Sequence, residues 1–248
     1  MASSFLPLSK RNSAEHRLIL FHHAGGSSMQ YHSLAAYLPE TWDVYAVDLP
    51  GRGCRTKLPL QENFETLLET LTKEMHELVD RPTFVVGHSM GSLLAFELVF
   101  QLESLGCRDI SLLAVSNMVA PKEKELEISL PFDIDSKEDL MEYLRSAGGL
   151  PEEIQQRSDI LDYYLNIIRA DLKALKSYSG HQNKTVQTPI LGCVSTEDPL
   201  STPEKILRWS QRTTGSFSLK LFEGSHFYLF ERPQNFIDGL MRSWEFHR

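Results

Sequence analysis

Cysteines are scarce in this sequence, long apolar runs are missing, and acidic residues outnumber basic ones. Its 248 residues include three cysteines, at 54, 107 and 193, which form no CxxC pair and no spacing typical of metal ligands. An odd count without a recognisable signal peptide favours a reducing compartment, so we expect a cytoplasmic protein. No apolar run approaches the roughly 18 residues of a membrane helix. The net charge of −8 argues against nucleic acid as the main partner.

Short β-rich runs alternate with helical stretches along the chain. The expected strands cover residues 17–21, 43–47, 83–87, 110–116, 189–195 and 217–222. The expected helices cover residues 63–79, 91–105 and 203–212, and a further helix starts at Pro233. Several of the strands are apolar throughout, which is typical of parallel strands buried on both faces. The alternation therefore predicts an α/β protein with a mostly parallel sheet flanked by helices.

One interval interrupts this alternation. About 70 residues separate the strand at 110–116 from the strand at 189–195, far more than a loop of roughly 2–6 residues and one helix require. We therefore expect a helical insertion over 120–185, placed on a core built from 1–119 and 186–248.

The insertion contains two helix signals. In the first, Ser136 stands at the expected N-cap, Asp139 occupies the capping-box position, and glycines close the helix. In the second, apolar residues recur at helical spacing and predict one apolar face. The members of this face are Ile160, Tyr163, Tyr164, Ile167, Ile168, Leu172 and Leu175.

The segment "FVVGHSMGSLLAFEL" (84–98) places a Gly-x-Ser-x-Gly pattern between an apolar strand and an apolar helix. The bare pattern is common, but a sharp strand–turn–helix connection with Ser89 at its tip is what a nucleophile elbow requires. Gly87 and Gly91 have no side chains to collide where the strand and the helix cross. We expect Ser89 to be a nucleophile; the alternative is a glycine-rich turn in which the serine only caps the helix.

A serine hydroxyl becomes an effective nucleophile only when a base removes its proton. In proteins with this elbow the chain order is serine, acid, histidine. Beyond the last expected strand, His226 follows through a glycine-containing loop, whereas His247 is the penultimate residue. The acid is expected after the preceding strand, where Glu197 and Asp198 stand. We favour Asp198 because Pro199 stiffens its turn, and its role would be to orient the imidazole.

The apolar run at 17–21 ends at "HHAGG". Adjacent His22 and His23 at a strand end point in different directions, and no second group of ligands accompanies them, so a metal site is not favoured. A serine hydrolase needs two backbone N–H donors for the oxyanion, one from the residue after the nucleophile, here Met90. The other comes from the loop after the neighbouring strand, and we assign it to Ala24. We expect His23 on the wall of this loop, against the substrate.

Six segments, in this order, resemble the external (type II) thioesterases of polyketide and nonribosomal peptide synthetases and the related medium-chain thioesterase of fatty acid synthase. The segments are "FHHAGG", "DLPGRGCR" (48–55), "GHSMGSLLAFEL" (87–98), "IIRADL" (167–172), "EDPL" (197–200) and "GSHFYL" (224–229). The resemblance implies an α/β-hydrolase fold with a triad of Ser89, Asp198 and His226. It also implies Ala24 and Met90 as oxyanion donors, and no metal or organic cofactor.

The resemblance implies the substrate as well. This would be an acyl group held as a thioester on the phosphopantetheine arm of an acyl or peptidyl carrier protein. The helical insertion would be a lid over the acyl chamber. Successive helix positions point about 100° apart, so one of Tyr163 and Tyr164 could face the sheet and the other the acyl chain; the alternative is that both only pack in the core. The sequence departs from the family at His22, where many relatives have proline.

Carrier proteins are generally acidic, so a protein of net negative charge needs a local basic patch to bind one. The candidates for this patch are Arg52, Arg55, Lys57, Lys122 and Lys124. Two other functions stay open. One is a small-molecule carboxylesterase or lipase with the same triad, and the other is a non-enzymatic binding module that keeps the fold.

Overall fold

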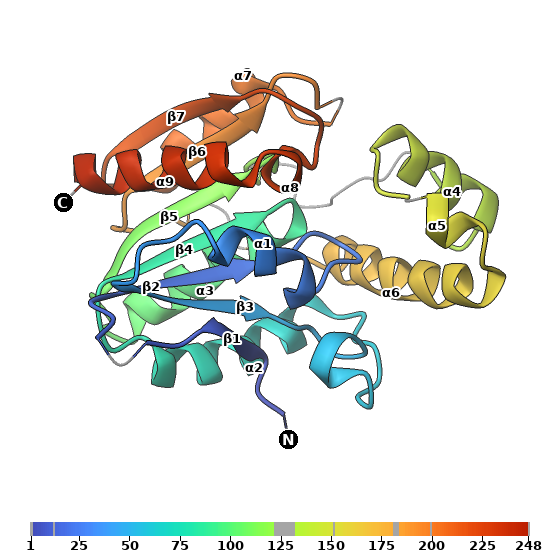
Figure 1. Cartoon of the computed structure of the whole chain (residues 1–248), viewed down its shortest axis with the longest axis horizontal. Helices are drawn as coiled ribbons and strands as arrows, with labels where there is room; N and C mark the ends of the chain where they lie inside the picture. The colour runs from blue at the N-terminus through green and yellow to red at the C-terminus, as the bar shows by residue number, and fades with distance from the viewer. Residues whose placement is uncertain are drawn as a thin grey trace.

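A mostly parallel sheet organises the protein. The computed structural model describes residues 2–11, 13–121, 132–150, 152–180, 184–198 and 200–247. In this part of the chain, one 7-stranded sheet has the order β1-β3-β2-β4-β5-β6-β7 (Figure 1). The strands are β1 (Phe5–Ser9), β2 (His16–Phe21), β3 (Trp42–Val47), β4 (Thr83–His88), β5 (Ile110–Ser116), β6 (Ile190–Ser195) and β7 (Phe217–Phe222). All neighbours pair in parallel except β1, which is antiparallel to β3. The expected α/β architecture is confirmed.

Both faces of the sheet are covered, which explains why several of its strands are largely apolar. In β2, Leu18 and Leu20 belong to one apolar core, and Ile19 and Phe21 belong to the core on the opposite face. All four side chains are at most 1% exposed. Successive strand residues point to opposite faces, so a strand buried on both sides cannot alternate polar and apolar residues.

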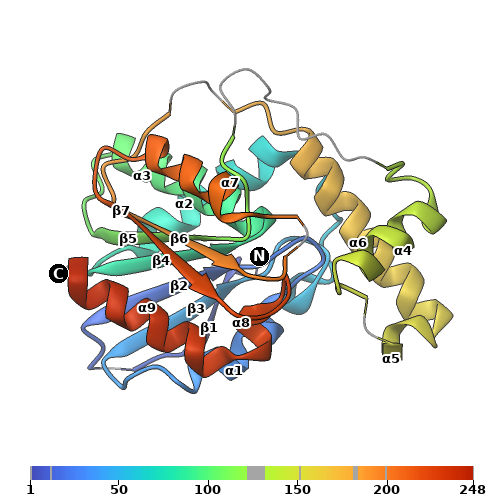
Figure 2. The same cartoon turned by 90° about the horizontal axis from the view of Figure 1, so that it is seen from above.

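Helices form the two outer layers. The α-helices are α1 (His32–Ala35), α2 (Phe64–Leu78), α3 (Met90–Ser104), α4 (Lys137–Ser146), α5 (Glu152–Gln155), α6 (Ser158–Lys176), α7 (Pro203–Leu207), α8 (Tyr228–Glu231) and α9 (Pro233–His247). The 3-10 helices are η1 (Ser28–Tyr31), η2 (Gly53–Arg55) and η3 (Arg208–Arg212). Figure 2 shows α2, α3 and α7 along one face and α1 and α9 along the other. None of the described helices is long and apolar enough to cross a membrane.

The sequence prediction missed β1. This strand is five residues long, lies at the edge of the sheet and contains Pro7. Its pairing with β3 shifts register between Pro7 and Ser9. Proline has no N–H to donate, and it is therefore tolerated in a sheet only at edges and bulges. The helix predicted over 203–212 is also divided, into α7 and η3.

The interval between β5 and β6 contains α4, α5 and α6, which gather at one end of the molecule (Figure 2). The Asp139 amide donates to the hydroxyl of Ser136 (3.2 Å), as expected at the start of α4, and Gly148 (φ +73°) follows its end. The Asp139 carboxylate accepts from the Asp133 amide (3.2 Å). The boundaries at 120 and 185 stay a prediction.

The apolar face of α6 is offset from the predicted one. Leu161 and Leu165 are buried, whereas Tyr163 is 50% exposed and Ile160 is only half-buried. Six buried residues of α6 belong to the same apolar core as α2, α3 and one face of the sheet: Leu161, Leu165, Ile168, Leu172, Ala174 and Leu175. Helix α6 is thus packed into the same core as one face of the sheet.

Two of the five candidate residues for a basic patch are buried. Arg52 and Arg55 are only 3% and 5% exposed, because partners within the fold hold both guanidinium groups in the interior. Lys57 is exposed. Lys122 and Lys124 lie outside the described residues. The two arginines therefore have structural partners and are not available to an acidic protein.

Candidate active site

The serine pattern forms a sharp turn between β4 and α3. Ser89 has φ 52° and ψ −124°, a conformation that non-glycine residues rarely adopt and that is typical of functional sites. A Cβ at Gly87 would collide with the backbone of Gly91, and a Cβ at Gly91 would collide with the carbonyl oxygens of Phe21 and His22. Both glycines are needed because the strand and the helix approach each other this closely.

A buried acid lies against the histidine of the last loop. The Nδ1 atom of His226 is 2.8 Å from Oδ2 of Asp198, and the two residues are 4% and 8% exposed. The other oxygen of Asp198 accepts the amide of Leu200 at 2.8 Å. The structure places the neighbouring Glu197 in solvent. His226 and Ser89 line the same cavity.

Two residues with backbone amides suited to bind an oxyanion line the same cavity. Ala24 follows β2 and Met90 begins α3, and both line the cavity together with Ser89. Within the part of the chain that the structure describes, no acceptor takes the amide hydrogen of Ala24 or of Met90. Gly25 has φ +84°, so the loop turns immediately after Ala24. The two amides are therefore free to bind an oxygen that becomes negatively charged.

Three buried histidines surround the site in the neutral form. Burial, and to a smaller extent the charge of Arg52, lowers the pKa of His22 to about 4. Burial is also the main cause that holds the pKa of His23 and of His88 well below the ordinary value. The ring of His88 lies 5.0 Å from the ring of His226, centroid to centroid. A positive charge that develops on His226 is thus not opposed by a second imidazolium.

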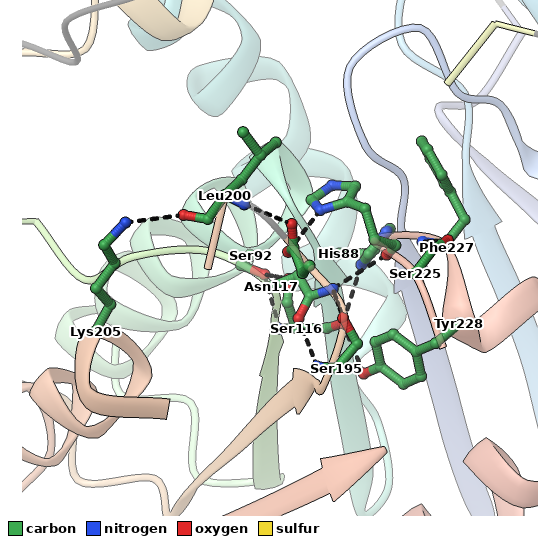
Figure 3. A network of polar contacts seen from close by, with 12 residues as sticks. His88, Ser92, Ser116, Asn117, Ser195, Leu200, Lys205, Ser225, Phe227 and Tyr228 are labelled. Carbon is green, nitrogen blue, oxygen red and sulfur yellow. Dashed lines mark hydrogen bonds and ion pairs between the residues drawn. The ribbon is translucent and has the colours of Figure 1, made fainter. Parts of the chain in front are cut away.

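Asn117 anchors the histidine loop, and the sequence analysis passed over it. Its side-chain amide donates to the hydroxyl of Ser195 (3.0 Å) and to the carbonyl of His226 (3.1 Å), and its Oδ1 accepts the Ser195 amide (3.0 Å). Figure 3 shows this contact between the ends of β5 and β6. The segment directly after β5 contains no carboxylate, so it offers no candidate for the acid. The available signal was an asparagine directly after a buried strand, since asparagine tolerates a positive φ, here 46°.

A second polar network connects His88, the residue before Ser89, to β5 and α8. The hydroxyl of Ser116 lies 2.9 Å from Nδ1 of His88 and 2.9 Å from the hydroxyl of Tyr228 (Figure 3). The Ser116 carbonyl also accepts the Ser89 amide at 2.8 Å. Strand β4, which leads to Ser89, and helix α8, which follows His226, are therefore both tied to β5.

Two adjoining cavities open at the site. The first has about 60 Å³ and lies beside Ser89 and His226, with mainly apolar walls. Helices α4 and α6 and the following loop contribute Tyr143, Leu144, Ala147, Gly149, Ile168, Leu172 and Leu175 to it. The second has about 270 Å³ and shares His23, Gly149 and Phe227 with the first. Tyr164 lines the second cavity.

Tyr163 does not lie where the sequence analysis expected it. It lines neither cavity, and its hydroxyl donates to the carbonyl of Gly51 at 2.8 Å. The stripe of α6 that faces the first cavity consists of Ile168, Leu172 and Leu175. Residues four and three positions apart share a helix face, and Tyr163 is not on that face. Pro199, invoked for the turn at Asp198, lies outside the described residues.

A serine elbow, an acid–histidine pair and two free amides at the ends of parallel strands are the parts of a serine hydrolase with the α/β-hydrolase fold. Residues 16–243 match the family of thioesterase domains, and the chain belongs to this family. The protein is therefore a hydrolase that acts on thioesters, as the motif resemblance indicated.

Named relatives support this assignment. Over 213 residues the chain is 34% identical to the probable cadicidin biosynthesis thioesterase of Streptomyces griseus, a match covering 86% of this chain and only 58% of that relative. It is 28% identical over 242 residues to the gramicidin S biosynthesis protein GrsT of Aneurinibacillus migulanus, covering 96% and 92%. The structure of the type II thioesterase BorB from the borrelidin biosynthetic cluster matches with a TM-score of 0.85 and 31% identity, covering 98% and 99%.

Proposed function

We propose that the protein is a type II thioesterase that removes acyl groups from the phosphopantetheine arm of carrier proteins in a polyketide or nonribosomal peptide synthetase. The observation that carries the proposal is the shared cavity in which Ser89, His226 and the amides of Ala24 and Met90 meet under α4 and α6. The names of BorB and GrsT support the biosynthetic setting. The cytoplasm remains the proposed location.

In the proposed reaction, Ser89 Oγ attacks the thioester carbonyl while His226 Nε2 takes the hydroxyl proton. The carbonyl oxygen becomes an oxyanion between the amides of Ala24 and Met90. Asp198 holds the imidazole by its Nδ1–H and stabilises the imidazolium. The C–S bond then breaks, and His226 returns the proton to the departing thiolate of the arm.

Water completes the cycle by hydrolysing the acyl-enzyme. His226 removes a proton from the water as it attacks the ester carbonyl, and the same two amides stabilise the second oxyanion. Collapse of this intermediate breaks the bond to Ser89 Oγ, which regains its proton from His226. The products are a free carboxylic acid and a carrier protein with a free thiol, ready to be loaded again.

The two cavities fit the two halves of this substrate. The cavity of about 270 Å³ is lined partly by Phe227, Phe230 and Tyr164 and adjoins the site through His23 and Gly149. We assign it to the phosphopantetheine arm. The apolar cavity of about 60 Å³ beside Ser89 is assigned to the acyl chain. It is much smaller than typical ligand pockets of roughly 300–1,000 Å³, so a long chain requires α4 to shift.

A comparison of two substrates with the same acyl group tests the proposal. One is the acyl thioester on a holo carrier protein, and the other is the p-nitrophenyl ester. We expect a kcat/KM at least about tenfold higher for the carrier thioester, because only this substrate can fill the arm cavity. Ser89→Ala serves as the blank for both. An ester hydrolysed as well as the carrier thioester would favour the small-molecule carboxylesterase instead.

A further inference from the structure

The "DLPGRGCR" and "IIRADL" segments have no role in the proposed mechanism, and one residue of each takes part in a contact at helix α6. Arg52 comes from the loop after β3, and Asp171 comes from the "IIRADL" segment of α6. The guanidinium binds the carboxylate with two nitrogens, Nη2 to Oδ1 at 2.7 Å and Nη1 to Oδ2. The side chains are 4% and 0% exposed.

The oxyanion loop is bound by the same carboxylate. The amide of Gly25 donates to Oδ2 of Asp171 at 2.7 Å. A Cβ at Gly25 would collide with the side chain of Ile168, so the loop lies directly on α6. This close packing and the φ of +84° both require glycine at position 25. The Gly25 amide is occupied by Asp171, and the preceding amide, that of Ala24, is the one left for the substrate.

Stability alone does not explain why a buried ion pair of this kind is present. Removing two charges from water is expensive, and apolar pairs of the same volume are often equally stable. Such a pair does, however, define geometry: the bidentate contact fixes the carboxylate, and the carboxylate fixes the Gly25 amide. Arg52 also balances the negative charge of Asp171, which would otherwise oppose an oxyanion forming at Ala24.

We propose that Asp171, held by Arg52, is a positioning residue that sets the oxyanion loop so that the Ala24 amide points at the reacting carbonyl. This inference rests on the proposed roles of Ser89 and Ala24. It makes α6 a fixed part of the catalytic apparatus and leaves movement of the lid to α4 and α5.

The test compares Asp171→Asn with Tyr163→Phe. The first keeps the volume of the side chain and loses the charged contact to Arg52 and Gly25. The second removes another tether of α6, the hydrogen bond to Gly51, which does not touch the oxyanion loop. We expect Asp171→Asn to lower kcat by about 10²-fold with little change in KM, as misplacement near 1 Å can do. Tyr163→Phe should stay within about twofold of the wild type.

A second measurement separates positioning from loss of structure. An acyl boronic acid forms a tetrahedral adduct on Ser89 and places an oxygen at the oxyanion donors, whereas an acyl-pantetheine thioether binds only as a ground-state analogue. For Asp171→Asn we expect the Kd of the boronic acid to rise by about 10²-fold and the Kd of the thioether to change less than about threefold. If Asp171→Asn does not fold, the same measurements are made on Arg52→Lys, which keeps both charges.

Two results would overturn the inference. One is an equal weakening of both analogues, and the other is a kcat of Asp171→Asn or Arg52→Lys that matches Tyr163→Phe. All assays include the p-nitrophenyl ester and the Ser89→Ala blank. If wild-type hydrolysis does not depend on Ser89, the proposed function has failed. If it does depend on Ser89 and the variants behave like the control, only the positioning role has failed.

Discussion

Leu172 is the residue whose truncation should change the preferred acyl chain. It projects from the middle of the α6 stripe into the small cavity beside Ser89, and it is 2% exposed. Replacing leucine by alanine removes three carbons, which leaves room for about three methylene groups of substrate. Each buried methylene contributes about 0.8 kcal/mol, so the preference for the longer chain should rise by up to roughly 60-fold in kcat/KM.

The assay is kcat/KM across a series of acyl thioesters that differ by two carbons. We expect Leu172→Ala to move the optimum towards longer chains, with the shortest chains losing activity because the enlarged cavity is poorly filled. The substitution also destabilises the fold by about 2–5 kcal/mol, as truncation of a buried leucine does. Thermal melting must therefore accompany the kinetics.

Leu165→Ala is the matched control. Leu165 lies on the same helix, is also 2% exposed and does not line the cavity. Its truncation should cause a similar loss of stability and leave the length profile unchanged. If Leu172→Ala lowered the rate by the same factor at every length, as we expect of Leu165→Ala, the cavity would not be the acyl chamber.

Two further predictions concern the acid and the buried histidines. Asp198→Asn should lower kcat by about 10⁴-fold, which is the loss seen for this change in a serine protease triad. Glu197→Gln should have little effect. If the two results were reversed, Glu197 and not Asp198 would be the acid of the triad. The unfolded chain binds a proton at His22 near pH 6.5 and the folded chain only near pH 4, so stability is full above pH 6.5 and falls as the pH drops towards 4. His22 alone accounts for about 3 kcal/mol of that loss. Urea unfolding at pH 7.5 and pH 4.5 should show a smaller difference in His22→Gln than in a variant of the exposed His32, and equal differences would contradict this.

The parts of the fold that the sequence predicts well depend on local pattern. Mainly apolar runs identified β2 to β7, of which β2 to β6 are almost entirely buried and β7 is mostly half-buried. Ser136 identified the start of α4. The short edge strand β1 has no such run and was missed. The Ser89, Asp198 and His226 positions follow from strand-end order, which a parallel sheet converts directly into proximity.

The misplaced residues all depend on long-range partners. Arg52 and Arg55 look like surface charges until Asp171, 119 positions along the chain from Arg52, is brought beside it. Tyr163 sits at an apolar helical spacing, but spacing alone does not say which face of α6 meets the cavity. Asn117 acts through amide hydrogen bonds to β6 and the histidine loop, contacts that only the assembled sheet creates.

The most direct test of the account is the mass of the protein during turnover. The enzyme is mixed with an acyl-carrier thioester, quenched in acid within milliseconds and digested for mass spectrometry. We predict that the peptide containing Ser89 gains the mass of the acyl group, and that Ser89→Ala shows no adduct and no hydrolysis. An acyl group on another residue, or full hydrolysis by Ser89→Ala, would contradict the central claim.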